Sequence, residues 1–162
     1  MVILIMGVAG AGKTTIGRQL AEALGWCFCD GDEFHSADNI EKLSRGIPLT
    51  DEDRRPWLAA IHAAIGTWIK NHDHVVLACS VLKTAYRATV LAGYRDHVRI
   101  VYLKASRTLL QQRLAHRTGH FMSEALLASQ FEILEEPSDD LVLDADQPSA
   151  VIVGRIRSAF GL

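Results

Sequence analysis

A glycine-rich segment near the start of the chain constrains the fold more than any other feature. Residues 7–14 read Gly-Val-Ala-Gly-Ala-Gly-Lys-Thr, which matches the pattern Gly-x-x-x-x-Gly-Lys-Ser/Thr. Such a segment binds phosphate where it joins a β-strand to an α-helix. Both neighbours fit, because the apolar residues 2–6 precede it and Ile16 and Leu20 follow it with helical spacing. The chain is therefore expected to begin with a strand, a phosphate-binding loop and a helix.

Further along, short apolar or β-branched runs alternate with helical patterns, which is typical of βαβ units on a parallel sheet. The expected strands are residues 2–6, 27–29, 74–79, 98–103 and 141–143. A chain of 162 residues has the size of one domain. The prediction is an α/β fold of three layers, with a parallel sheet of about five strands and a single domain over residues 1–162.

The starts of several helices are marked by residues that cap a first turn. Ser106 and Ser123 each precede a helical pattern. Thr50, followed by three acidic residues, also predicts a helix start, although Pro56 allows the regular helix to begin there instead. Residues 36–48 and 116–122 are expected to be mobile insertions.

Charge and apolar content argue against several classes of protein. The chain has 17 Lys and Arg against 19 Asp and Glu, so it has no global basic field of the kind that attracts nucleic acid or a membrane surface. The apolar residues 1–12 fall short of the roughly 18 that span a bilayer, and they lack the basic start of a signal peptide. Three cysteines fit neither a disulfide framework nor a four-ligand zinc site. We expect a cytoplasmic protein without nucleic-acid or membrane partners.

The glycine-rich loop predicts how a nucleoside triphosphate is bound. In such loops the backbone N–H groups turn toward the phosphates, assisted by the positive end of the following helix. Lys13 is expected to reach the β- and γ-phosphates, and the Thr14 hydroxyl to hold Mg²⁺. The expected nucleotide-binding residues are Gly7, Ala9, Gly10, Ala11, Gly12, Lys13, Thr14 and Thr15.

Other features narrow the choice of phosphate acceptor. The sequence lacks the Asn-Lys-x-Asp motif of regulatory GTPases and the Ser-Gly-Gly signature of ABC-type ATPases. A short chain with a late, arginine-bearing helix favours small-molecule and nucleotide kinases, in which a lid closes over the donor. Arg113 and Arg117 lie four residues apart, hence on one helix face, where they would neutralise charge on the transferring phosphoryl group. Both are candidate catalytic residues in a lid expected at about residues 112–123.

Two carboxylates follow the second expected strand, at the edge where open α/β sheets bind ligands. Asp30 and Asp32 are separated by one glycine, so both side chains can face one cavity. Asp30 is expected to face the water shell of the metal. Asp32 is the candidate for orienting or deprotonating the acceptor hydroxyl.

Several blocks of the middle and late chain form an ordered set. They are residues 30–35 with Asn39, Lys42, Gly46, Pro48, Leu49, Asp51, Asp53, Arg54, Pro56, Trp57 and Leu58; residues 79–83 with Tyr86 and Arg87; residues 119–122; and residues 129–131 with Leu134 and Glu135. In this order they resemble the gluconokinases, small P-loop carbohydrate kinases, over nearly the whole chain. Ser123 departs from an expected proline, and Ala9 and Ala11 stand where serine is more frequent.

The resemblance implies a P-loop kinase fold that transfers the γ-phosphoryl group of ATP to the 6-hydroxyl of D-gluconate. It also implies a homodimer, adenine bound near residues 144–150, and acceptor binding by about residues 30–58. Gluconate carries a carboxylate opposite its primary alcohol, so its site needs a cation away from the phosphates. Arg54 is the leading carboxylate partner, with Lys83 and Arg87 as second choices. His35 and His120 are candidates for binding substrate hydroxyls.

Three alternatives remain open at this stage. A kinase for another small polyol acid, such as shikimate, would share the phosphate loop and the paired aspartates. A nucleoside monophosphate kinase would be revealed by turnover of AMP or CMP. From a different class, a non-catalytic ATP-binding regulator would bind ATP without turnover that an acceptor stimulates.

Overall fold

A five-stranded parallel sheet forms the centre of the computed structural model, which describes residues 1–115 and 123–162. The strands are β1 (Val2–Met6), β2 (Cys27–Asp30), β3 (Val75–Ala78), β4 (Val98–Lys104) and β5 (Leu141–Asp144). Their order across the sheet is β2-β3-β1-β4-β5, and every neighbouring pair is parallel. β1 is thus central, and the glycine-rich loop follows it directly. The predicted α/β class and parallel sheet are confirmed.

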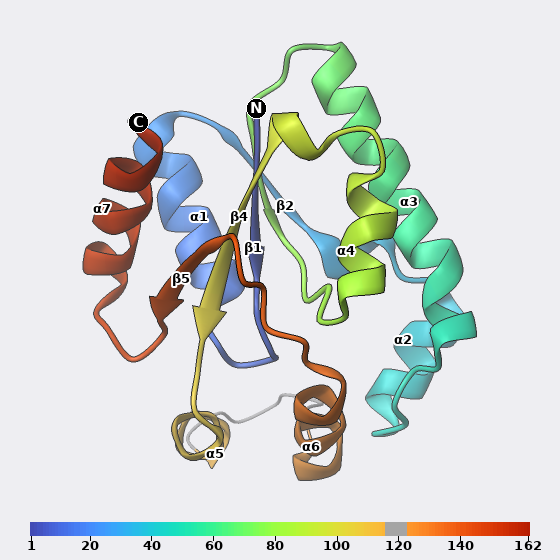
Figure 1. Ribbon diagram of the computed structural model, residues 1–162. Coiled ribbons are helices and arrows are strands. Elements are labelled where there is room, and N and C mark those ends of the chain that lie inside the picture. Colours follow the sequence, from blue (N-terminus) through green and yellow to red (C-terminus); the bar gives the residue numbers. More distant parts are fainter. Residues whose placement is uncertain (116–122) are drawn as a thin grey trace.

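Helices cover both faces of the sheet (Figure 1). One face carries α1 (Lys13–Leu24) and α7 (Ser149–Phe160), and the other carries α3 (Asp51–Lys70) and α4 (Thr84–Leu91). In the residues that the structure describes, three more helices, α2 (Ala37–Ser44), α5 (Arg107–Ala115) and α6 (Glu124–Ile133), complete the regular structure together with short 3₁₀ turns at Gly31–Phe34 and Arg95–His97. None of the helices in the described ranges has both the length and the apolarity needed to cross a membrane.

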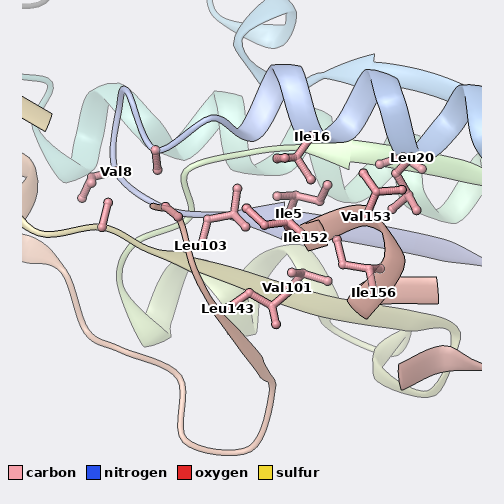
Figure 2. Packing of buried hydrophobic residues seen from close by; sticks show 14 of the residues in the cluster. Ile5, Val8, Ile16, Leu20, Val101, Leu103, Leu143, Ile152, Val153 and Ile156 are labelled. Atoms are coloured by element: carbon pink, nitrogen blue, oxygen red, sulfur yellow. The ribbon is translucent and has the colours of Figure 1, made fainter. Parts of the chain in front are cut away.

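The side chains of β1 alternate between two apolar cores, because successive residues of a strand point to opposite faces. Ile3 and Ile5 pack with residues of α1 and α7, while Leu4 packs with residues of α3 and α4. Figure 2 shows the first of these cores, in which Ile5, Ile16, Leu20, Val101, Ile152, Val153 and Ile156 come together. All five residues of β1 are fully buried, which explains why the strand is uniformly apolar.

Helix α3 begins at Asp51, so the prediction based on Thr50 is confirmed over the alternative start at Pro56. The Thr50 hydroxyl accepts from the Asp53 N–H at 3.1 Å, and the Asp53 carboxylate accepts from the Thr50 N–H at 2.9 Å. This reciprocal capping box satisfies two N–H groups that a helix start leaves unpaired. Pro56 lies inside the helix, near enough to its start that only one turn precedes it.

The expectation of a mobile insertion at residues 36–48 is wrong for its first part, which forms α2. Ser36 caps this helix by accepting from the Asn39 N–H at 3.2 Å. Polar contacts then attach α2 to α3: the Asn39 amide donates to the Asp53 carbonyl at 2.8 Å, and Lys42 pairs with the Asp53 carboxylate at 2.7 Å. Because polar contacts hold α2, its sequence lacks the apolar periodicity from which longer helices are predicted. The other expected insertion, 116–122, and most of the expected lid lie outside the described residues.

Candidate active site

The loop between β1 and α1 has a backbone that requires glycine at several positions. Gly10 and Gly12 adopt φ values of 82° and 102°, in the left-handed region that side chains disfavour. A Cβ atom on Gly7 would lie 2.8 Å from the carbonyl oxygen of Leu103. The loop therefore passes close to β4 and turns directly into the N-terminus of α1, as a phosphate-binding loop does.

Lys13 is the first residue of α1, and its ammonium group lies within the loop. Nζ donates to the carbonyl oxygen of Val8 at 3.2 Å. Burial lowers the pKa of Lys13, while the nearby carboxylates of Asp32 and Asp30 act in the opposite direction. A cation that lies at the turn from a glycine-rich loop into a helix N-terminus is suited to an anionic ligand such as a phosphate chain.

Thr14 and Asp30 lie side by side, as the metal-site prediction requires. The Thr14 hydroxyl donates to Asp30 Oδ2 at 3.0 Å, and Asp30 Oδ1 accepts from the Asp32 N–H at 3.1 Å. In the described part of the chain, no group of three or more His, Cys, Asp or Glu residues is placed to hold a metal ion by itself. Mg²⁺ is usually bound by one or two protein oxygens together with phosphates and water. The adjacent oxygens of Thr14 and Asp30 fit that arrangement, and their role as ligands stays a prediction.

A pocket of about 560 Å³ opens beside the loop and collects most of the candidate residues. From the loop and α1 it is lined by Ala9, Gly10, Gly12, Lys13, Thr14 and Thr15, and from the acceptor side by Asp30, Asp32, His35, Leu43, Leu49, Arg54, Trp57, Ser80, Leu126 and Gln130. The parallel strands end at this edge, as expected for a ligand site of an open α/β sheet. Phosphate-binding and acceptor-binding candidates thus share one cavity.

His35 is held in the pocket wall by Trp57. The two rings stack with centroids 4.5 Å apart and an interplanar angle of 10°. The Trp57 indole N–H donates to the Gly31 carbonyl at 2.7 Å, which fixes the ring on which His35 lies. Burial lowers the pKa of His35, and the Asp32 carboxylate opposes that shift. His35 is therefore a neutral imidazole near pH 7, suited to hydrogen bonding with a hydroxyl group.

The three predicted carboxylate partners have different positions. Arg54 lines the pocket. Lys83 instead pairs with both carboxylate oxygens of Asp51 at 2.9 Å. Arg87 is only 7% exposed and donates to the carbonyl oxygens of Val81 and Leu82 at 3.2 and 3.0 Å. Neither Lys83 nor Arg87 lines the pocket, so Arg54 alone of the three is placed to meet a substrate there.

Arg113 lies against the phosphate loop but not in the pocket wall. Its Nη1 donates to the carbonyl oxygens of Gly10 and Ala11 at 3.1 and 3.3 Å, and its Nη2 donates to the Ala145 carbonyl at 2.6 Å. In this structure Arg113 therefore joins the loop to the segment that follows β5. Arg117 and His120 lie outside the described residues, so their predicted roles have no structural counterpart here.

Gln130 is a pocket residue that sequence reasoning did not single out. Its Oε1 accepts from the Ala9 N–H at 2.7 Å, although the two residues are 121 positions apart. Gln130 lies on α6, close to Leu126, which also lines the pocket. The only signal in the sequence was its place in the block of residues 129–131, and that block alone does not indicate a role for the Gln130 side chain. The contact brings the helix after residues 116–122 directly onto the phosphate loop.

Known proteins share the sequence pattern and the fold of this chain. Residues 2–137 match the family model described as an AAA domain. A probable gluconokinase from Xenopus tropicalis is 44% identical, with 97% of this chain and 92% of that protein covered. The gluconokinase from Gluconobacter oxydans is 46% identical, covering 85% of this chain and 77% of its own. Among solved structures, a gluconokinase from Sinorhizobium meliloti aligns with a TM-score of 0.85 and 39% identity, covering 99% of this chain and 95% of its own.

The fold is also shared with a kinase that is far more distant in sequence. Shikimate kinase from Aquifex aeolicus aligns with a TM-score of 0.62 at 15% identity, with 99% of this chain and 96% of that chain covered. At that identity the likeness shows the fold alone. Together with the strand order it confirms the predicted P-loop kinase architecture.

Proposed function

The chain belongs to the gluconokinase family, and from that premise we propose that it transfers the γ-phosphoryl group of ATP to the 6-hydroxyl of D-gluconate. The products are 6-phospho-D-gluconate and ADP. The observation that carries this proposal is the shared pocket, in which the phosphate loop, Asp32 and Arg54 line one cavity. A linear acid with a primary alcohol at one end and a carboxylate at the other needs these three elements.

In this mechanism the chain supplies positioning and electrostatic stabilisation. Loop N–H groups and Lys13 bind the phosphates of ATP, and Asp32 orients the acceptor hydroxyl or accepts its proton. Phosphoryl transfer passes through a loose transition state, so alignment and charge stabilisation provide most of the rate enhancement. Mg²⁺, held by Thr14 and Asp30, would neutralise phosphate charge. We assign Arg117 to the same task within the lid, and Arg113 to support of the loop that carries the phosphates.

Several features of the molecule belong to the same proposal. They are a homodimer, a cytoplasmic location, one domain with acceptor binding by about residues 30–58, a lid at about residues 112–123, and adenine binding near residues 144–150. The homodimer and the adenine segment rest on the family resemblance, and the single domain and the cytoplasmic location on chain length and cysteine content. The contact of Arg113 with Ala145 supports a link between the phosphate loop and the adenine segment.

The direct test is ADP release with Mg·ATP and a panel of D-gluconate, shikimate, glucose, glycerate, AMP and CMP. We expect stimulation by gluconate and its loss in Lys13→Ala, because the phosphates then lose their principal cation. Lys104→Ala is the matched control, since Lys104 pairs with Glu136 on the surface, away from the pocket. Stimulation by shikimate or a nucleoside monophosphate instead would mean that this compound, and not gluconate, is the phosphate acceptor. ATP binding without turnover that an acceptor stimulates would favour a non-catalytic ATP-binding regulator.

A further inference from the structure

The first turn of α3 carries three carboxylates close to Arg54, and each of them is engaged elsewhere. Asp51 accepts from Lys83 at 2.9 Å, and Asp53 pairs with Lys42 at 2.7 Å. Glu52 pairs with Arg55 at 2.7 Å. Within residues 1–115 and 123–162, Arg54 forms no salt bridge. Its charge is therefore left for a ligand, although Asp51 lies at the i−3 position from which helix ion pairs usually form.

The guanidinium of Arg54 is held by uncharged acceptors instead. Its Nη1 donates to the Leu49 carbonyl at 2.6 Å and to the Tyr86 hydroxyl at 3.2 Å. Its carbon lies 5.5 Å from the centroid of the Tyr86 ring, within cation–π range. These contacts fix the direction of the side chain without neutralising it.

The hydroxyl of Tyr86 has a defined direction in this arrangement. Arginine N–H groups can only donate, so the Tyr86 oxygen accepts from Arg54 and its own proton goes to Asp51 Oδ1. Tyr86 is 5% exposed, and burial followed by the bond to Asp51 raises its pKa, which keeps the hydroxyl protonated. Asp51 thus accepts from Lys83 and Tyr86 and forms no salt bridge with Arg54 in the described part of the chain. The bonds from Tyr86 and Lys83 lower the pKa of Asp51, and the Arg54 charge helps to lower it.

We propose that Tyr86 is a positioning residue that keeps Arg54 oriented and out of a salt bridge, so that the acceptor site selects polyols that carry a carboxylate. This inference rests on the proposed function and deepens it. Tyr86 itself does not line the pocket. Its effect passes through Arg54 and concerns binding of the acceptor.

The test is Tyr86→Phe, which keeps the ring and removes only the hydroxyl. We expect KM for gluconate to rise about 3- to 10-fold, with kcat and KM for ATP within about twofold, because one hydrogen bond to a binding group is lost. Tyr102→Phe is the matched control: Tyr102 is also buried, its hydroxyl also meets a carboxylate, Glu136 at 3.4 Å, and it does not line the pocket. Tyr102→Phe should leave kcat and the KM values for gluconate and ATP unchanged. An unchanged KM for gluconate in Tyr86→Phe would overturn the proposal.

A double-mutant cycle separates positioning from a general structural role. In an Arg54→Ala background, Tyr86→Phe should cause no further loss, because its effect acts through the missing guanidinium. Additive losses would mean that Tyr86 acts independently of Arg54. Calorimetric titration of the same variants with gluconate gives a readout that needs no turnover.

Adding D-glucitol to the acceptor panel separates failure of this inference from failure of the proposed function. D-Glucitol has the gluconate chain with an alcohol in place of the carboxylate. A wild-type enzyme that prefers D-glucitol would overturn the carboxylate receptor and the gluconate assignment together. A wild-type enzyme specific for gluconate whose Tyr86→Phe variant is unchanged would overturn the inference alone.

Discussion

Asp30 and Asp32 differ in their hydrogen bonding although they are separated by one residue. Asp30 accepts from the Thr14 hydroxyl and from the Asp32 N–H. The Asp32 carboxylate accepts no hydrogen bond from the described residues, and it lines the pocket. Asp30 is thereby fixed beside the phosphate loop, while Asp32 is available to an incoming hydroxyl. Asp30 is thus held at the predicted metal site, and Asp32 is free for the substrate.

Asp32→Asn tests this division at the scale of one side chain. We expect kcat to fall by about 100-fold or more, because an amide can neither accept the proton nor align the hydroxyl as a carboxylate does. KM for ATP should change little. Asp96→Asn is the control, since Asp96 also lies in a 3₁₀ turn, Arg95–His97, but outside the pocket. A variant with wild-type turnover would exclude a role for Asp32 in the transfer step.

At the scale of elements, Asp53 connects α2 to α3. Its carboxylate accepts from Lys42 on α2 and from the N-cap residue of α3, Thr50. The Lys42 bond, followed by the Thr50 bond, lowers the pKa of Asp53 from its ordinary value of 3.8 to about 2. One ionised side chain thus holds the short helix against the long one and caps the long one.

The lowered pKa predicts how stability depends on pH. Because the folded pKa lies below the unfolded value, the carboxylate stabilises the fold fully above pH 3.8 and loses this effect as pH falls toward 2. We expect the free energy of unfolding of Asp53→Asn to lie below that of the wild type at pH 6. The gap should narrow between pH 4 and pH 2. Denaturant unfolding at each pH measures the free energy of unfolding of both proteins. A difference between them that stays constant from pH 6 to pH 2 would contradict the prediction.

The elements differ in how far the sequence could predict them. The strands and α3 were predictable because a buried strand is continuously apolar and a capping box is local. α2 was not, because its attachment depends on Asn39 and Lys42 meeting Asp53, contacts that only the folded chain creates. The same holds in the site. Arg54 and Arg87 are both candidate partners for the substrate carboxylate in the sequence. Only the folded chain shows that Arg87 donates to backbone carbonyl oxygens, while Arg54 lines the pocket.

At the scale of the whole molecule, the sheet separates two cores that share its strands. Leu20 from α1 belongs to one core and Ile61 from α3 to the other, and both are fully buried. Ile133, the last residue of α6, packs against both cores, whereas Leu20 and Ile61 each belong to one core only. The Leu20 and Ile61 side chains are therefore expected to contribute to stability independently.

Leu20→Ala and Ile61→Ala test that independence. Each should lower the free energy of unfolding by about 2–5 kcal/mol, because each leaves a cavity in a close-packed interior. The double variant should equal the sum of the two losses within about 0.5 kcal/mol, since the two side chains belong to different cores on opposite faces of the sheet. Denaturant titration of the three variants measures these values. A coupling energy between the two substitutions well above about 0.5 kcal/mol would show that the two cores affect each other through the sheet.

The central position of β1 also determines when the nucleotide site can exist during synthesis. β1 is the first strand to leave the ribosome, yet its two neighbours are β3, at Val75–Ala78, and β4, at Val98–Lys104. The backbone of β1 therefore has both of its neighbours only after about two thirds of the chain has emerged. Gly7 lies close to Leu103, so its turn takes final shape only with β4 in place. A nascent chain that binds ATP has already assembled the centre of its sheet.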